Sequence, residues 1–336
     1  MDHNWQPIIA EIKKSKHILL TTHVNPDGDG LGSELAMYYC LKGMGICSII
    51  LNDSATPEEY KFLDPNGVIW CYNPEKHDEI LRTIDLVFTL DIGGFSRLGK
   101  LGNELSHLNL TTICIDHHSE NHLCCTHKIV DEESPATACL IYELLKILYP
   151  QSIDQKIAKA VYVGLLTDTG SFRFENTNST VMEIAAELIK LGVKPMEIFQ
   201  QVYESYTPQR MKLLGIALQK VQYGCDGRLA WFTITTADRL ATGVTLDEIN
   251  GFTDFVRSIK GVEVSIMFLE TNDETIRVNF RSKGKILVNE IAIQFGGGGH
   301  YFAAGATIKG SLETALNRIL PVARRSVEQP NSGVKA

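Results

Sequence analysis

Residues 17–30 read HILLTTHVNPDGDG, and this stretch decides the fold. Its first six residues, His17–Thr22, are apolar and β-branched in the pattern typical of a buried strand. A polar turn containing Pro26 and Gly28 comes next, and a helix is predicted directly after it at Leu31–Lys42. A strand that passes through a tight turn into a helix is the first part of a βαβ unit, so the sequence predicts a parallel sheet.

The same alternation continues through the first half of the chain. Short β-prone runs are predicted as strands at Cys47–Leu51, Leu86–Leu90 and Thr111–Ile115, with turns and amphipathic segments between them. We therefore expect an α/β fold with a mostly parallel sheet that is flanked by helices. In sheets of this kind, chemistry takes place beyond the carboxyl ends of the strands.

The chain has 336 residues, more than one hydrophobic core usually supports, so two domains are expected. We predict a first domain at 1–194, a helical linker at 195–222, a smaller α/β domain at 223–326 and a disordered tail at 327–336. In the smaller domain the expected strands are Leu229–Ile234, Val262–Leu269, Thr275–Phe280 and Ala306–Ile308, and the expected helices are Leu246–Ile259, Val288–Gln294 and Leu312–Arg325.

Composition excludes several classes of protein. The net charge of −8 argues against binding of long duplex DNA, where neutralisation of phosphates dominates affinity. No apolar run reaches membrane-spanning length and the N-terminus lacks a signal-peptide pattern, so we expect a cytoplasmic protein without a membrane partner. The eight cysteines include no CxxC pair, which favours reduced thiols and argues against a zinc–thiolate site.

Acidic and histidine side chains follow three of the predicted strands. Each group has an ordinary explanation when taken alone, because Asp is common at helix N-caps and in turns. If the strands are parallel, however, all of these side chains gather at one edge of the sheet. They are His23, Asp27 and Asp29 after the first strand, Asp91 after LVFTL, and Asp116, His117 and His118 after TTICI.

A further carboxylate, Asp168, lies in GLLTDTGSFRF, where an apolar helix is expected to stop. A negative charge near a helix C-terminus is unfavourable, and a bound cation would explain it. Asp and His ligands without cysteine suit Mn²⁺, and suit Mg²⁺, Co²⁺ or Zn²⁺ less specifically. Two such ions about 3.5–4 Å apart can activate water and stabilise a phosphoryl displacement.

At this point the residues resemble a known family. HVNPDGD, Asp91, the triplet DHH at 116–118 and TDTGSFRF resemble the four motifs of the DHH phosphoesterases. The segments that begin at Arg257 and at Val278, and GGGGH at 296–300, resemble the DHHA1 domain. One departure is Gly30, where the family often has Ala; it lies beside the ligand turn and should not alter metal binding.

The resemblance implies two divalent metal ions, with Mn²⁺ preferred and Mg²⁺ or Co²⁺ as substitutes. It implies that His23 and Asp27 hold one ion, that Asp29, His117 and Asp168 hold the other, and that Asp91 bridges them.

Two further residues of this edge receive catalytic roles from the resemblance. His118 would face the substrate phosphate, and Asp116 would orient the histidines. Water activated between the ions would attack the phosphoester without a covalent intermediate.

The second domain is expected to hold the substrate. Glycine amides can form an anion-binding nest, and arginine can bind phosphate in a bidentate manner. The alternatives are a flexible glycine loop and solvated surface charges. The residues expected to contact substrate are Arg257, Arg281, Ser282, Gly297, Gly298, Gly299 and His300.

The two-domain layout resembles the nanoRNase/pAp phosphatase branch of the family. That branch hydrolyses short oligoribonucleotides and removes the 3′-phosphate of 3′-phosphoadenosine 5′-phosphate (pAp), and by analogy we also expect a homodimer. Alternatives with the same metal core are a cyclic or linear dinucleotide phosphodiesterase and an exopolyphosphatase. A nucleotide-binding protein without activity should show a replaced ligand, and every expected ligand is present.

Overall fold

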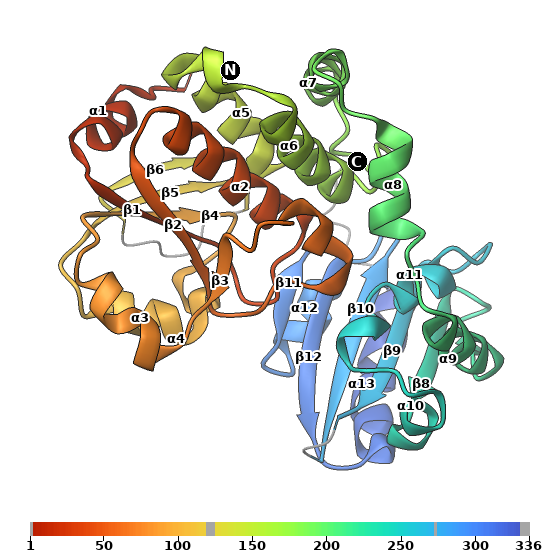
Figure 1. The fold of residues 1–336 in the computed structure, drawn as a ribbon. Helices are drawn as coiled ribbons and strands as arrows, with labels where there is room; N and C mark the ends of the chain where they lie inside the picture. Colours follow the sequence, from red (N-terminus) through yellow and green to blue (C-terminus); the bar gives the residue numbers. More distant parts are fainter. Residues whose placement is uncertain (1–2, 119–124, 272–273, 330–336) are drawn as a thin grey trace. The chain divides into compact units, whose positions relative to one another are not determined.

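A computed structural model describes residues 3–118, 125–271 and 274–329. The chain divides into two compact units, residues 1–205 and 206–336, and each is described by itself (Figure 1). The predicted α/β class is confirmed, because each unit contains one sheet covered by helices.

The first unit is built on a six-stranded sheet in which every neighbouring pair of strands is parallel. The strand order is β3-β2-β1-β4-β5-β6, so β1 lies at the centre and the order turns back beside it. The bounds are β1 (His17–Thr21), β2 (Cys47–Asn52), β3 (Ile69–Cys71), β4 (Leu86–Leu90), β5 (Thr111–Asp116) and β6 (His127–Val130).

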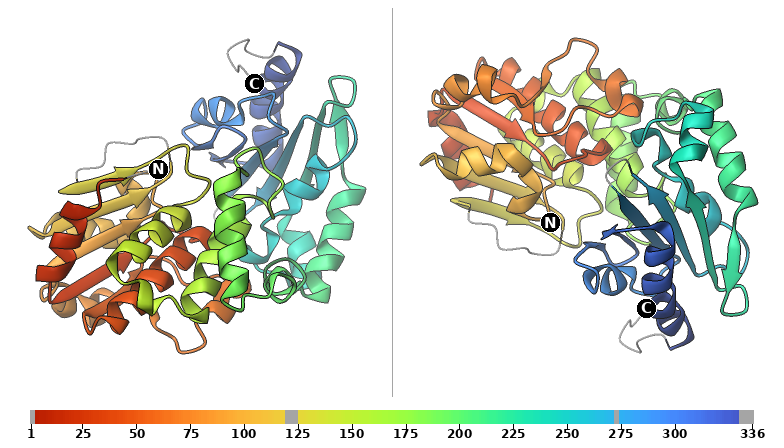
Figure 2. Two further views of the ribbon diagram at one scale, coloured as in Figure 1. Left: turned by 90° about the horizontal axis from the view of Figure 1, so that it is seen from above. Right: turned by 90° about the horizontal axis from the view of Figure 1, so that it is seen from below.

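Side-chain alternation along the strands fills both faces of this sheet. Ile18 and Leu20 of β1 belong to one buried cluster, whereas Leu19 between them belongs to another. Because successive strand residues point to opposite faces, a continuously apolar strand needs helices on both. One face is covered by α1 (Gln6–Lys14), α2 (Gly28–Gly43), α5 (Thr137–Leu148) and α6 (Gln155–Asp168), and the other by α3 (Pro74–Leu81) and α4 (Gly99–Ser106) (Figure 2).

The second unit has a six-stranded sheet of order β11-β12-β10-β9-β8-β7. Only β8 and β9 are paired in parallel; the other pairs are antiparallel. The strands are β7 (Gln222–Gly224), β8 (Leu229–Ile234), β9 (Val264–Glu270), β10 (Thr275–Ser282), β11 (Gly298–His300) and β12 (Ala303–Lys309). One face packs against α12 (Val288–Ile293) and α13 (Leu312–Glu328), the other against α9 (Pro208–Gln219) and α11 (Phe252–Arg257); α10 (Thr236–Thr242) follows β8.

Two expectations about chain segments need correction. The single helix expected at Leu246–Ile259 is interrupted at Gly251, whose φ of 83° is left-handed and separates η4 (Asp247–Ile249) from α11. The expected start of the tail at residue 327 is wrong, because Val327 is fully buried in the core of the second unit and α13 continues to Glu328. Residues 330–336 lie outside the described part.

The segment expected to form a separate linker, 195–222, is divided between the units. It contains α8 (Pro195–Tyr203), which follows α7 (Ser179–Lys190), and α9. Helix α8 buries Ile198 in the core of the first unit, and α9 buries Leu213 in the core of the second. Because each helix is amphipathic, its apolar face packs against the core of one unit.

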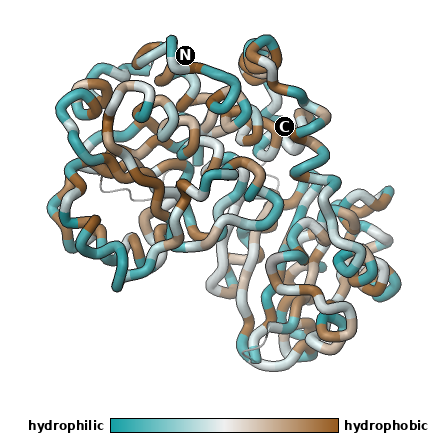
Figure 3. The backbone as a smooth tube through the Cα atoms, viewed as in Figure 1, coloured by the Kyte–Doolittle hydropathy of each residue, from teal (hydrophilic) through white to brown (hydrophobic). Residues whose placement is uncertain are grey.

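Apolar sequence in the first unit gathers along the inner strands β1 and β2 (Figure 3).

Among residues 3–118, 125–271 and 274–329, no helix is both long enough and apolar enough to cross a membrane.

Candidate metal centre

The predicted site residues of the first unit meet at the carboxyl edge of its sheet. His23 follows β1, Asp91 follows β4, and Asp116 ends β5. These three strands are neighbours in the order β1-β4-β5 and are parallel. The sheet therefore brings together residues that are 25 to 93 positions apart in sequence, as predicted from the strand ends.

One group of ligands consists of His23, Asp27 and Asp91. The Nε2 atom of His23 lies 3.6 Å from Oδ2 of Asp27 and 3.7 Å from Oδ2 of Asp91. All three ligand atoms fall within 4.8 Å of one another, which is the spacing of atoms that share a metal ion.

A second group consists of Asp29, His117 and Asp168, again within 4.8 Å of one another. Nε2 of His117 lies 2.9 Å from Oδ2 of Asp168 and 3.9 Å from Oδ2 of Asp29. It also lies 3.6 Å from Oδ1 of Asp91, the residue that the first group uses through its other oxygen. Asp91 thus adjoins both groups, which is the arrangement a bridging carboxylate requires.

The two ligand histidines are oriented by backbone carbonyl oxygens. Nδ1 of His23 lies 2.8 Å from the carbonyl oxygen of Val24, and Nδ1 of His117 lies 3.1 Å from that of Ser134. Because a carbonyl oxygen can only accept, each Nδ1 donates. Each Nε2 faces the carboxylates, and a cation that displaces its proton would find the nitrogen lone pair directed at it.

Asp29 is held by a helix to which it does not belong. Its Oδ2 accepts from the backbone N–H of Thr137 at 2.7 Å and its Oδ1 from that of Ala138 at 2.9 Å. These are the first residues of α5, whose N-cap residue Ala136 makes no capping bond of its own. The carboxylate of Asp29 therefore caps α5 and is fixed in orientation.

Asp91 has an unfavourable backbone conformation. Its φ is 58°, in the left-handed region that residues other than glycine seldom adopt, and its side chain is buried. The hydroxyl of Thr137 donates to Oδ1 of Asp91 at 3.1 Å. Such backbone geometry occurs often where a side chain must be aimed at a ligand.

The chemistry of the donor set fits cations. Burial, followed by the charges of Asp91 and Asp168, raises the pKa of Asp29 well above its usual value. Burial is also the largest cause that raises the pKa of Asp91. Buried carboxylates that repel one another this closely are stabilised as anions by a divalent ion.

His118 pairs with Asp116 and also forms a third possible ligand group with Asp91 and His117, within 4.8 Å of one another. Nδ1 of His118 donates to Oδ1 of Asp116 at 2.7 Å, and it lies 3.3 Å from Oδ1 of Asp91. Burial opposes protonation of His118, but the bonds to Asp116 and Asp91 outweigh it and raise the pKa to about 10. Oδ2 of Asp116 accepts from the N–H groups of Ile92 and Gly93, so Asp116 ties His118 to the strand ends.

Glycines allow α2 and α6 to approach closely enough for Asp29 and Asp168 to meet. A Cβ added at Gly32 would lie 2.3 Å from the carbonyl oxygen of Ala160, and one at Gly164 would lie 2.7 Å from Oδ1 of Asp29. Real Cβ atoms do not approach neighbours so closely, so larger residues at these positions would separate the two helices.

Residues that the sequence pattern missed lie around this site. Asn52 accepts from the backbone N–H of Thr22 at 3.0 Å and donates to Oε2 of Glu34 at 2.9 Å, and both side chains are fully buried. Burial raises the pKa of Glu34 to about 8. The sequence offered two indications of this contact: Asn52 is a polar residue at the end of β2, and Glu34 is an acid on the buried face of α2.

Arg97 was missed as well. Its Nη1 lies next to the backbone of Gly93, where the His118 ring also lies. Burial opposes protonation of His23, but the hydrogen bond and charge of Asp27 and the charge of Asp91 outweigh it and raise the pKa overall. The charge of Arg97 opposes this rise in the pKa of His23. A guanidinium group beside His118 is suited to a substrate phosphate.

The second unit brings Arg257 and Arg281 to one carboxylate. Nη2 of Arg257 lies 3.1 Å from Oδ1 of Asp254, and Nε of Arg281 lies 3.6 Å from Oδ2. Both arginines remain partly exposed. Both guanidinium groups thus lie at one carboxylate, and such groups are suited to a phosphate.

The other expected substrate residues are placed differently. Ser282 is buried, and its hydroxyl accepts from the N–H groups of Gly284 and Ile286, so it stabilises a turn and is not presented at the surface. Gly297 and Gly299 approach the backbone of β12 too closely for a Cβ, and Gly298–His300 pairs with β12 as a strand. The expected glycine nest is thus partly used in sheet pairing; the side chain of His300 lies outside the described part.

A parallel sheet with a paired Asp/His site at its carboxyl edge defines a candidate dinuclear metallohydrolase. The model for the DHH family, N-terminal domain, matches residues 17–165, and the DHHA1 domain model matches residues 233–329. The chain belongs to the DHH/DHHA1 family.

Similar proteins extend over the whole chain. "Bifunctional oligoribonuclease and PAP phosphatase NrnA" of Thermus thermophilus is 32% identical, covering 95% of this chain and 94% of the relative. The protein of the same name from Bacillus subtilis is 28% identical over 90% and 92%. An exopolyphosphatase-related protein from Bacteroides fragilis has a solved structure with a TM-score of 0.91 and 26% identity, covering 96% of this chain and 97% of that one.

Proposed function

We propose that this chain is a metal-dependent phosphoesterase that hydrolyses short oligoribonucleotides and pAp. One observation carries the proposal: two groups of Asp and His ligands adjoin Asp91 at the edge where chemistry occurs in parallel sheets. Relatives that are similar over nearly the whole chain and are named oligoribonuclease and PAP phosphatase support the choice of substrate.

We propose that His23, Asp27 and Asp91 hold one ion, and that Asp29, His117, Asp168 and Asp91 hold the other. Mn²⁺ suits this mixture of carboxylate and imidazole. The ions would supply Lewis acidity and a nucleophilic water at neutral pH.

Side chains of the protein would bind and orient the phosphate. His118 would hydrogen-bond to a phosphate oxygen or to the leaving oxygen. Asp116 would keep its imidazole oriented by accepting from Nδ1 at 2.7 Å. Arg97 would add charge at the same phosphate. In the second unit, Arg257 and Arg281 would bind a phosphate of the nucleotide.

A substrate panel with Mn²⁺ tests the proposal. We expect phosphate release from pAp and mononucleotide release from di- to pentanucleotide RNA, with little turnover of cyclic dinucleotides or pyrophosphate. Asp91→Asn should abolish both activities, whereas Asp226→Asn, which changes an acid in a turn of the second unit, should retain them. Turnover of pAp and short RNA by Asp91→Asn at the normal rate would refute the dinuclear site.

A second candidate is hydrolysis of polyphosphate. It is favoured by the fold similarity to the exopolyphosphatase-related protein, which shares 26% identity. Adding polyphosphate of graded length to the panel decides between the two, because a preference for polyphosphate would reject the nucleotide substrate and leave the metal centre intact. Light scattering of the purified chain tests the expected homodimer.

A further inference from the structure

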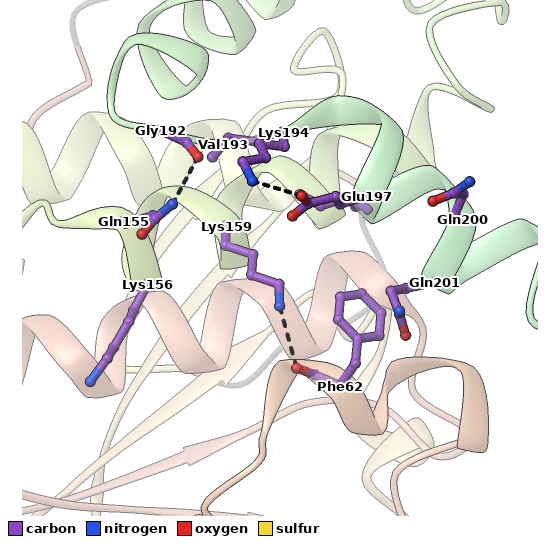
Figure 4. Close-up of a pocket in the computed structure, with 11 residues that line it drawn as sticks. Phe62, Gln155, Lys156, Lys159, Gly192, Val193, Lys194, Glu197, Gln200 and Gln201 are labelled. Carbon is purple, nitrogen blue, oxygen red and sulfur yellow. Dashed lines mark hydrogen bonds and ion pairs between the residues drawn. The ribbon is translucent and has the colours of Figure 1, made fainter.

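A cavity of about 510 Å³ lies in the first unit away from the metal ligands. It is bounded by the start of α6, by η1 (Glu58–Leu63) and by the segment that leads into α8 (Figure 4). Three lysines line it, Lys156, Lys159 and Lys194, against one acid, Glu197. In a chain of net charge −8, this local excess of positive charge indicates an anionic ligand.

Lys159 lacks a close acidic partner. Its Nζ lies 3.5 Å from the carbonyl oxygen of Phe62 and 4.7 Å from the centre of the Phe62 ring. Within the described part of the chain, no carboxylate lies at ion-pair distance from this nitrogen, and Glu197 acts on it only from further away. Burial lowers the pKa of Lys159, so the site disfavours the charge that an anion in the cavity would stabilise.

The opposite wall can also receive an anion. Lys194 pairs with Glu197 at 2.7 Å, but both side chains are about two-thirds exposed, and exposed pairs of this kind are weak and exchange readily. Lys194 is also the N-cap residue of the nine-residue helix α8, where no side chain caps the free N–H groups. The positive end of that helix adds to the charge of the lysines.

We propose that this cavity binds a nucleoside monophosphate, with the phosphate between Lys159 and Lys194 and the base against Phe62. The Phe62 ring stands between Lys159 and Gln201, whose amide can hydrogen-bond to a base (Figure 4). The volume lies within the usual range for small-molecule sites.

None of the proposed metal ligands lines the cavity, although η1 also carries Tyr60, which lies near Asp27. Lys159 and Asp168 both belong to α6 and are nine residues apart, which is about 14 Å along the helix axis. The proposal therefore does not depend on which phosphoester the metal centre hydrolyses.

Calorimetry with AMP, ribose 5-phosphate and inorganic phosphate tests the site on metal-free protein that carries Arg281→Gln, in which the metal centre cannot capture phosphate and the Arg257/Arg281 cluster is weakened. We expect AMP to bind most tightly and Lys159→Gln to weaken it about tenfold, because a hydrogen bond to a charged group is lost. Lys159→Arg should keep most of the affinity, and Lys309→Gln, which removes one exposed charge of the second unit, should keep all of it. Equal affinity of Lys159→Gln and wild type would overturn the proposal, and equal binding of ribose 5-phosphate and AMP would overturn the contact with the base.

Lysine labelling locates the ligand without a substitution. A limiting amount of an acylating reagent, read by mass spectrometry, should modify Lys159 and Lys194 more slowly when AMP saturates the protein, with Lys309 unchanged. Unchanged labelling of Lys159 and Lys194 would refute the cavity as the AMP site. Hydrolysis with Mn²⁺, measured in parallel on Lys159→Gln, reports separately on the proposed function.

Discussion

The first unit collects carboxylates out of water, whereas the second collects guanidinium groups that stay partly in water. Asp29 and Asp91 are almost fully buried, and burial and mutual repulsion raise their pKa values. Arg257 and Arg281 share Asp254 and remain partly exposed. A buried acidic cluster therefore depends on its cation for stability, whereas a half-exposed basic cluster depends little on its anion.

The largest expected effect is on catalysis, and it comes from the carboxylate that adjoins both ligand groups. Asp91→Asn should lower the rate of hydrolysis by at least about 10³-fold, since stabilisation of charge by the metals would be lost. Metal analysis of the purified variant should show fewer bound ions. The same change should not destabilise the metal-free protein, because it removes a buried repulsive charge; a large fall in its melting temperature would contradict the contrast.

Glu34 offers a pH test of the same buried region. Its carboxyl is fully buried, and its pKa is raised from 4.5 to about 8, so the folded state holds a proton that the unfolded state releases. Stability from this group is present below pH 4.5 and is lost as the pH rises through 8.

Glu34→Gln should therefore stabilise the metal-free protein above pH 8, by on the order of 5 kcal/mol, and change little at pH 4.5. Denaturant unfolding across this range measures the difference. If the free energies of unfolding of Glu34→Gln and wild type differ by the same amount at every pH, Glu34 titrates normally.

Adding Mn²⁺ tests how strongly the first unit, compared with the second, depends on its ligand for stability. Mn²⁺ at a hundred times its dissociation constant should raise the free energy of unfolding of the first unit by about 2.7 kcal/mol, because it binds only the folded state. The effect should be smaller in Asp29→Asn, which removes a ligand of one ion and leaves His23, Asp27 and Asp91 to hold the other. Phosphate should stabilise the second unit much less, and an equal stabilisation by phosphate alone would break the contrast between the regions.

The smallest expected effect is in the basic cluster. Arg281→Gln should raise KM for pAp about tenfold with little change in kcat, because a contact that is equal in ground and transition states is removed. Arg325→Gln, on an exposed part of α13, serves as the matched control. A fall in kcat at unchanged KM would place Arg281 in the chemical step instead.

Much of the candidate site could be predicted because its residues follow strands. HILLT, LVFTL and TTICI each end at a polar residue, and parallel pairing brings those ends together. Gly32 and Gly164 could not be interpreted, because the need for glycine arises only where α2 and α6 cross. Asn52 and Glu34 were missed because their partners belong to other elements: Asn52 accepts from the backbone of Thr22, and Glu34 accepts from Asn52.

The second unit was predicted less well, for a physical reason. The glycine run suggested a nest, but antiparallel pairing with β12 depends on residues that follow it in the chain, and the pattern of one segment does not reveal its partner. Ser282 was chosen for its hydroxyl and proved to be buried, because it lies at the end of a strand where alternation turns it inward. The short β11 contains little except glycine, so no strand propensity marked it.

The way α5 holds Asp29 has a consequence for the kinetics of metal exchange. Both oxygens of Asp29 already accept backbone N–H groups of that helix, so the carboxylate needs no rearrangement when an ion arrives. A preorganised ligand gives up little conformational entropy on binding, so loading should be fast and should leave the surrounding backbone unchanged. The protein should then lose and regain its ions as a folded molecule, and the ions available around it would set its active fraction from moment to moment.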